Sequence, residues 1–195
     1  MYFMIVKKIF FGTILIALMS LMACHDVSGL SKEFACNNTP NLPKLETVKD
    51  FNNLFSVRLP KYWNTKLYYD SSQSEIISAD TIKNLTETYI MDFSMISSQV
   101  KIDQDLQKKV ALKNKENNLE NIKEFFYTIH RKKAFSNLSK GIKEGHTFHI
   151  LQSYIKVSDT KFLLVKAEFY GEQYFDLRLC ESIHLLDDIQ FLTES

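Results

Sequence analysis

The sequence predicts an α+β fold in which helices flank an antiparallel sheet. Apolar and polar residues alternate with the period of two that is typical of half-buried strands, most clearly in residues 88–96, 146–157 and 161–170. Helical spacing occurs in two places, after residue 103 and after residue 171. Strands that follow one another with so few helices between them favour antiparallel pairing.

The first strands are expected between residues 55 and 96. Alternation begins in residues 55–59, and Pro60 ends this strand. Residues 66–70 and 75–79 are expected to form short strands around a polar turn. Residues 88–96 form a stronger strand that carries four large apolar side chains on one face: Tyr89, Met91, Phe93 and Met95.

A helix and further strands follow. Asp103 is expected to cap a helix that ends near Asn117. Residues 123–130 return to the strand pattern, whereas residues 131–145 are polar and are expected to form a loop with turns at its two glycines.

The last elements are a hairpin and a helix. Residues 146–157 and 161–170 are joined by only three residues, which suits an antiparallel hairpin. After Gly171 the spacing is helical, with apolar residues three or four apart: Leu179, Ile183, Leu186 and Ile189.

The N-terminus predicts export. Lys7 and Lys8 precede an apolar run of about 14 residues, which is shorter than the roughly 20 that a membrane-spanning helix needs. A basic start, a short apolar run and small residues at its end are typical of a cleaved signal. We therefore expect residues 1–23 to be a signal peptide.

The end of that signal resembles the lipobox of bacterial lipoproteins. Its residues are Leu21, Met22, Ala23 and Cys24. The resemblance implies that Cys24 is lipidated and becomes the first residue of the mature protein, anchored to a membrane of the cell envelope. His25 stands second in the mature chain, where an aspartate favours inner-membrane retention in some bacteria, so the outer membrane is the expected location.

The rest of the chain is expected to form a tether and one domain. Residues 24–47 contain two of the three prolines and no sustained apolar period, which predicts a flexible linker of about 25–30 Å. Residues 48–195 are expected to form a single globular domain. Without Lys7 and Lys8 the chain has 22 basic and 23 acidic residues, which argues against a nucleic-acid partner.

Two cysteines, Cys36 and Cys180, remain in the mature chain. Disulfides persist in exported proteins, so these two residues are candidates for a bridge. A small buried thiol is equally ordinary at Cys180, within an apolar helical pattern. Both alternatives stay open at the level of sequence.

One segment resembles the opening of PsbP-like proteins, a group that includes Mog-type Ran-binding proteins. It is FSVRLPKYW, from Phe55 to Trp63, where an aliphatic-Pro-x-x-Trp segment ends the first core strand of the family. The order of elements and the closing stretch 183–191 are also similar, so the resemblance covers residues 50–192. It implies an α-β-α sandwich used for binding or assembly, although Tyr62 replaces the small residue that usually precedes the tryptophan.

Motifs for catalysis and for cofactors are missing from the sequence. There is no glycine-rich phosphate loop and no Gly-x-Ser-x-Gly elbow. His146 and His149 are the only close histidine pair, and residues three apart on a strand point to opposite faces. We therefore expect no catalytic, cofactor-binding or metal-binding residues.

Four residues are candidates for a binding surface. Arg131, Lys132 and Lys133 form the main concentration of charge, which could contact anionic headgroups or an acidic partner. Trp63, the sole tryptophan, is expected either to fill the core or to offer a ligand platform.

Together these features predict a membrane-tethered, non-catalytic envelope lipoprotein that acts as a binding or assembly module. Its partners are the membrane, through Cys24, and a protein of the cell envelope. The alternatives are an envelope enzyme, such as a hydrolase with a site built from dispersed residues, and a purely structural lipoprotein.

Overall fold

The structure is a computed structural model that describes residues 29–36 and 42–192. The described helices are α2 (Gly29–Glu33), α3 (Gln104–Glu116) and α4 (Phe175–Asp187). The described strands are β1 (Leu45–Lys49), β2 (Phe55–Pro60), β3 (Asn64–Tyr69), β4 (Gln73–Ala79), β5 (Tyr89–Ile96), β6 (Glu120–Ile129), β7 (Lys132–Lys143), β8 (His146–Lys156), β9 (Phe162–Tyr170) and β10 (Gln190–Phe191).

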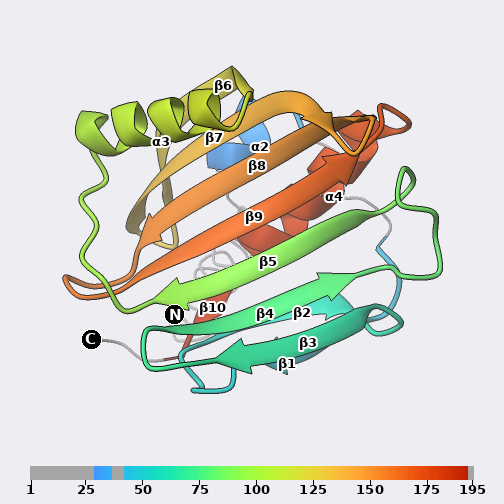
Figure 1. Cartoon of the computed structure of the whole chain (residues 1–195). Helices are drawn as coiled ribbons and strands as arrows, with labels where there is room; N and C mark the ends of the chain where they lie inside the picture. Colours follow the sequence, from blue (N-terminus) through green and yellow to red (C-terminus); the bar gives the residue numbers. More distant parts are fainter. Residues whose placement is uncertain (1–28, 37–41, 193–195) are drawn as a thin grey trace, which may run out of the picture.

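The strands form two antiparallel sheets. Seven of them form one sheet in the order β3-β4-β5-β9-β8-β7-β6, and the other three form a sheet in the order β1-β2-β10. Figure 1 shows α3 on one face of the large sheet and α2 and α4 behind its other face. The predicted α+β class and its α-β-α layering are confirmed.

The main core lies between the large sheet and α4. Strand β5 contributes its four alternating apolar side chains, all of them buried. Helix α4 contributes Leu179, Ile183 and Leu186, and β2 inserts Phe55, Val57 and Leu59 into the same cluster. The small sheet therefore shares its core with the large one, and the period-two pattern of residues 55–59 reflects this burial.

Several predicted elements agree with the structure. Asp103 caps α3, because its side chain accepts hydrogen bonds from the backbone N–H groups of Asp105 and Leu106. Strands β8 and β9 form the expected hairpin. Helix α4 ends at Asp187, so Ile189 packs into the core from just beyond the helix.

The loop predicted for residues 131–145 is wrong. Most of this stretch is β7, which pairs with β6 on one side and with β8 on the other. Some of its core-facing residues are serines. One of them, Ser136, forms a hydrogen bond with Ser153 of β8, with 2.6 Å between the two Oγ atoms. Because helices cover both faces of this strand and several buried positions are polar, the alternation that marks a strand is lost.

Gly141 lies within β7 and does not form a turn. A Cβ atom at this position would lie 2.9 Å from the carbonyl oxygen of Asn118 and 2.7 Å from Leu119. The glycine therefore lets the connection between α3 and β6 approach β7 closely. The other glycine of this stretch, Gly145, does form the turn between β7 and β8 with a φ of 78°.

The flexible linker predicted for residues 24–47 is wrong for two parts of that range. Residues 29–36 contain helix α2, whose Leu30 is fully buried, and the strand β1 begins at Leu45. Cys36 and Cys180 form a disulfide, with 5.3 Å between their Cα atoms, that joins this segment to α4. The predicted signal peptide and Cys24 lie outside the described residues.

In the described part of the chain, no helix has the length and apolar character needed to cross a membrane.

Candidate functional site

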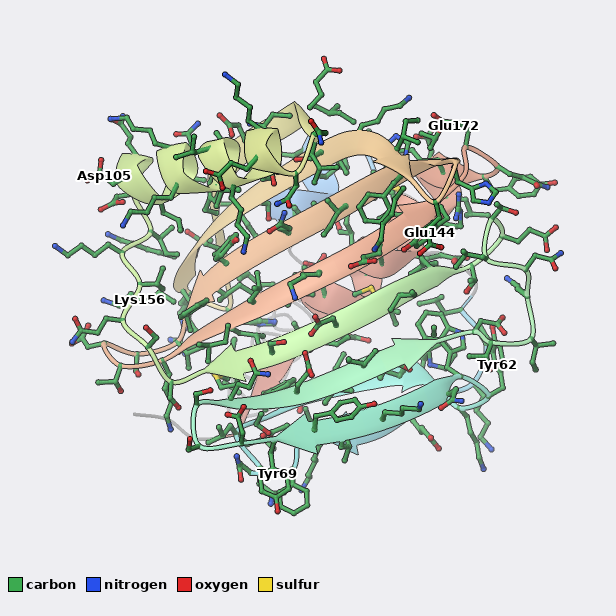
Figure 2. The ribbon with its side chains drawn as sticks, in the orientation of Figure 1. Tyr62, Tyr69, Asp105, Glu144, Lys156 and Glu172 are labelled. Atoms are coloured by element: carbon green, nitrogen blue, oxygen red, sulfur yellow. A yellow bond between two sulfur atoms is a disulfide. The ribbon has the colours of Figure 1, made fainter. Side chains whose placement is uncertain are left out.

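A shallow basic hollow lies at one end of the large sheet. Its volume is about 610 Å³, and two tight connections form it: the β6–β7 turn and the β8–β9 turn. Its lining combines four cationic side chains with polar and hydroxyl groups: Arg131, Lys132, Lys133, Lys156, Val157, Ser158, Asp159 and Thr160. Figure 2 shows Lys156 at the end of the sheet that lies away from Tyr62 and Glu172.

The β6–β7 turn is a two-residue hairpin of unusual composition. Ile129 pairs with Lys132, and the intervening His130 and Arg131 both have positive φ angles, 47° and 62°. Glycine or asparagine normally occupies such positions. The ring of His130 is held by a 3.0 Å contact between its Nε2 and the carbonyl oxygen of Asp187. Arg131 is exposed and makes no such contact within the described residues.

Replacing Arg131 with glycine is expected to stabilise the fold by up to about 1 kcal/mol. Glycine adopts positive φ without the steric cost that a side chain incurs, and this gain exceeds its larger loss of backbone entropy. Urea denaturation of the R131G variant measures the change. R131Q is the control because it keeps the strain and removes the charge, and its unfolding midpoint should not change. A midpoint that falls in R131G would contradict the strain assigned to this turn.

The four cations of the hollow differ in how they are held. Lys132 is fixed, because its Nζ donates to the carbonyl oxygen of Val157 at 3.1 Å and lies 5.0 Å from the centre of the Phe191 ring. Lys156 pairs with Asp159 at 2.7 Å, and the hydrogen bond from this ammonium group lowers the pKa of the Asp159 carboxyl group. This leaves Arg131 and Lys133 exposed, without an ion pair among the described residues.

The chemistry of the hollow suits an anion. The lining holds a single carboxylate, that of Asp159, against four cationic side chains: Arg131, Lys132, Lys133 and Lys156. Guanidinium and ammonium groups donate hydrogen bonds to phosphate or carboxylate oxygens, and the hydroxyl groups of the β8–β9 turn can add to them. The four cationic side chains give the hollow the chemistry of an anion-binding surface.

Trp63 does not belong to this surface. It is buried, and its ring packs edge-on against Tyr89 with 5.0 Å between centroids. Its neighbour Tyr62 lies at the opposite end of the sheet from Lys156 in Figure 2. The predicted grouping of Trp63 with the basic residues is therefore wrong, and the tryptophan fills the core.

A second ionisable cluster surrounds Tyr89, and it is structural. Arg178 is buried and donates to three backbone carbonyl groups, those of Thr88, Tyr170 and Gly171. Burial raises the pKa of the Tyr89 phenol well above its ordinary value and also raises the pKa of the Glu181 carboxyl group. Because the guanidinium group is occupied by backbone oxygens, the cluster fixes the start of α4 against the sheet.

The two histidines of β8, His146 and His149, are three residues apart on the strand, so their side chains point to opposite faces of the sheet. His146 is exposed, whereas His149 is buried and its ring stacks on Phe175 with 4.0 Å between centroids. Burial lowers the pKa of His149, and the nearby Glu172 opposes this effect.

A smaller hollow of about 340 Å³ lies between α3 and β6. It is lined by Gln104, Gln107, Lys108, Ala111 and Glu124. The amide of Gln107 donates to the Glu124 carboxylate at 2.5 Å, so these polar groups serve to attach the helix to the sheet.

Of the two turns that form the basic hollow, the sequence predicted the contribution of one. Arg131, Lys132 and Lys133 were expected as a charged surface, but the contribution of the β8–β9 turn was missed. The signal that could have found it is topological. If residues 131–145 are read as a strand between 123–130 and 146–157, the β6–β7 and β8–β9 turns must lie at the same end of the sheet.

One comparison with a solved structure supports the fold. Neither a family model nor a curated protein sequence matches this chain. Among solved structures, the cyanobacterial PsbP of Synechocystis, CyanoP, superimposes with a TM-score of 0.59 at 11% identity, covering 79% of this chain and 96% of that one. LpqN of Mycobacterium tuberculosis, which is involved in cell envelope biogenesis, gives a TM-score of 0.48 at 10% identity and covers 77% and 91%.

The chain therefore has a PsbP-like fold. The similarity to CyanoP covers nearly the whole of that protein, and the resemblance carried by residues 55–63 falls on β2 and the turn after it. At this level of sequence identity the comparison establishes architecture, and the function has to be argued from the residues of this chain.

Proposed function

We propose that this protein is a lipid-anchored, non-catalytic binding or assembly module of the bacterial cell envelope. Cys24 is the anchor, and the basic hollow is the binding surface. His25 at the second mature position favours the outer membrane over the inner one. The partners in this proposal are the membrane itself and a protein of the envelope.

The disulfide is the observation that carries this proposal. The chain has three cysteines, and the structure pairs two of them, Cys36 with Cys180. Cys24 is thus the remaining thiol, and it occupies the position that the lipobox requires. A stable disulfide also fits the oxidising compartments outside the cytoplasm.

The same pairing argues against thiol catalysis. A disulfide sulfur is not a thiolate, so neither Cys36 nor Cys180 can act as the nucleophile of a hydrolase while bonded. The hollow itself offers cations and hydroxyl groups, and its one carboxylate, Asp159, is paired with Lys156. Binding is the function that these groups support best.

Replacing Cys24 with alanine is expected to abolish lipidation. Metabolic labelling with an alkyne-bearing fatty acid should mark the wild-type chain but not C24A, and C24A should retain its 23-residue signal. The double variant C36A/C180A is the matched control, because it removes two cysteines and keeps the lipobox. Fatty-acid label that persists in C24A would show that the anchor lies elsewhere.

A further inference from the structure

We infer that the basic hollow docks on the anionic lipid headgroups of the membrane that holds the anchor, so that the hairpin tips face the bilayer. This inference rests on the proposed lipidation of Cys24 and adds an orientation to it. Three observations carry it: the place where the N-terminal segment joins the fold, the length of chain that remains before Cys24, and the distribution of charge.

The N-terminal segment joins the fold beside the basic turn. A Cβ atom on Gly29 would lie 3.2 Å from the Cβ of Tyr127 on β6. At the other end of α2, Glu33 forms an ion pair with Lys123 of β6, with 3.1 Å between Lys123 Nζ and Glu33 Oε2. Helix α2 therefore runs antiparallel to β6, and its first residue is the one nearest the β6–β7 turn.

The position of α2 is fixed by covalent and polar contacts. The hydroxyl of Ser31 donates to the carboxylate of Asp187 at 2.9 Å, and the backbone carbonyl of Asp187 in turn contacts His130 of the turn. The Cys36–Cys180 disulfide closes the other end of this segment. Gly29 is thus held about three strand residues, or about 10 Å, from the tip of the hairpin.

Little chain remains between this point and the anchor. Only four residues lie between Cys24 and Gly29, and a fully extended chain spans at most about 18 Å over those five steps. A long tether would leave the domain free to turn, but a link of this length keeps the side of the domain where Gly29 lies close to the membrane. That side carries the basic hollow.

The charge distribution matches this orientation. Arg131 and Lys133 are exposed on the tip without an ion pair among the described residues, and Lys132 and Lys156 lie beside them. Figure 2 shows Glu144 and Glu172 at the opposite end of the sheet. Cationic side chains are attracted to an anionic leaflet only within about a Debye length, which the short link makes accessible.

The test uses the lipidated protein, purified from membranes and reconstituted into nanodiscs. One set of discs contains phosphatidylcholine alone, and the other also contains phosphatidylglycerol. The readout is the rate of lysine acetylation at each site, measured by mass spectrometry. We expect Lys133 and Lys156 to react several-fold more slowly on the anionic discs, while Lys109 and Lys115 of α3 react equally on both. Raising the salt to about 1 M should remove the protection.

Two double variants distinguish the effect of the charges on the hairpin tip from the effect of the net charge of the protein. R131Q/K133Q should lose the protection of Lys156, whereas K109Q/K115Q, which removes the same number of charges from α3, should keep it. Lys132 is left unchanged because it holds Val157 and Phe191 in place. Equal acetylation of the tip on both kinds of disc would overturn the inference.

Other outcomes would assign the hollow to a different ligand. Protection by inorganic phosphate that is the same on neutral and anionic discs would make the hollow a site for a free anion. Protection that requires an envelope protein extract would make the partner an acidic protein. Failure of the lipidation test is distinguishable from both, because protein without a lipid would not insert into the discs at all.

Discussion

Removing the disulfide is expected to lower the free energy of unfolding by about 5 kcal/mol. The bridge closes a loop of 144 residues, and in the chain-entropy model the stabilisation grows with the length of the closed loop. The variant is Cys36→Ala together with Cys180→Ala. Equilibrium urea unfolding gives the change, and the reduced wild-type chain should unfold with the same midpoint as the double variant.

The loss should appear first in α2. Its buried Leu30, together with Phe34 and Cys36 just beyond its end, attaches this short helix to the core. A five-residue helix has no stability of its own, so it depends on these contacts and on the bridge. Amide exchange within residues 29–36 should therefore accelerate more than exchange in β5.

Lys109→Ala, an exposed change on α3, is the control for this experiment. Its unfolding free energy should change by no more than the ~0.5 kcal/mol that is typical of a surface substitution. A double variant C36A/C180A as stable as the wild type would mean that the long loop is already closed by other contacts in the denatured chain.

The same bridge shows why the N-terminal segment could not be predicted from the sequence. Residues 29–36 have neither the length nor the apolar period of an independent element, and their order comes from Cys180 and Asp187 of α4, far along the chain. Composition reports local preference, and here tertiary contacts override it. By contrast, β5 and the β8–β9 hairpin follow a period that each segment carries by itself.

The basic hollow was predicted in part for a related reason. Three adjacent cations are visible in any reading of the chain, whereas the contribution of Lys156 and the β8–β9 turn depends on recognising β7 as a strand. Ser136, Asn137 and Ser139 are fully buried in β7. Polar residues of this kind resemble a loop in sequence because their hydrogen-bond partners lie on other strands and on α3.

Replacing Asn114 of α3 with alanine is expected to cost about 3 kcal/mol, because it leaves several buried polar groups without their shared partner. The Asn114 side chain is buried, and its amide nitrogen lies within 2.8 Å of Asn121 Oδ1, 2.7 Å of Asn137 Oδ1 and 2.7 Å of Ser139 Oγ. Its own oxygen accepts from Gln152 at 3.4 Å. This asparagine is therefore the centre of the network that attaches α3 to the sheet.

The aspartate variant, Asn114→Asp, sharpens the test. The substitution keeps the shape of the side chain and replaces its donor with a second acceptor, which would face the side-chain oxygens of Asn121 and Asn137. N114D should therefore be at least as destabilised as N114A at neutral pH, since the buried carboxylate would keep only the long hydrogen bond from Gln152 and would face two side-chain oxygens. Lys115→Ala, an exposed change one residue along the same helix, should alter the unfolding free energy by no more than ~0.5 kcal/mol.

A double-mutant cycle with Asn137 distinguishes the network from simple packing. If the two amides act through one shared hydrogen bond, N137A should cost much less in the N114A background than in the wild type, with a coupling energy of about 0.5–3 kcal/mol. Additive effects would show that each side chain contributes only its own packing. Amide exchange in α3 supplies the structural readout, because a helix whose exposed face is polar has little to hold it in place once this network is broken.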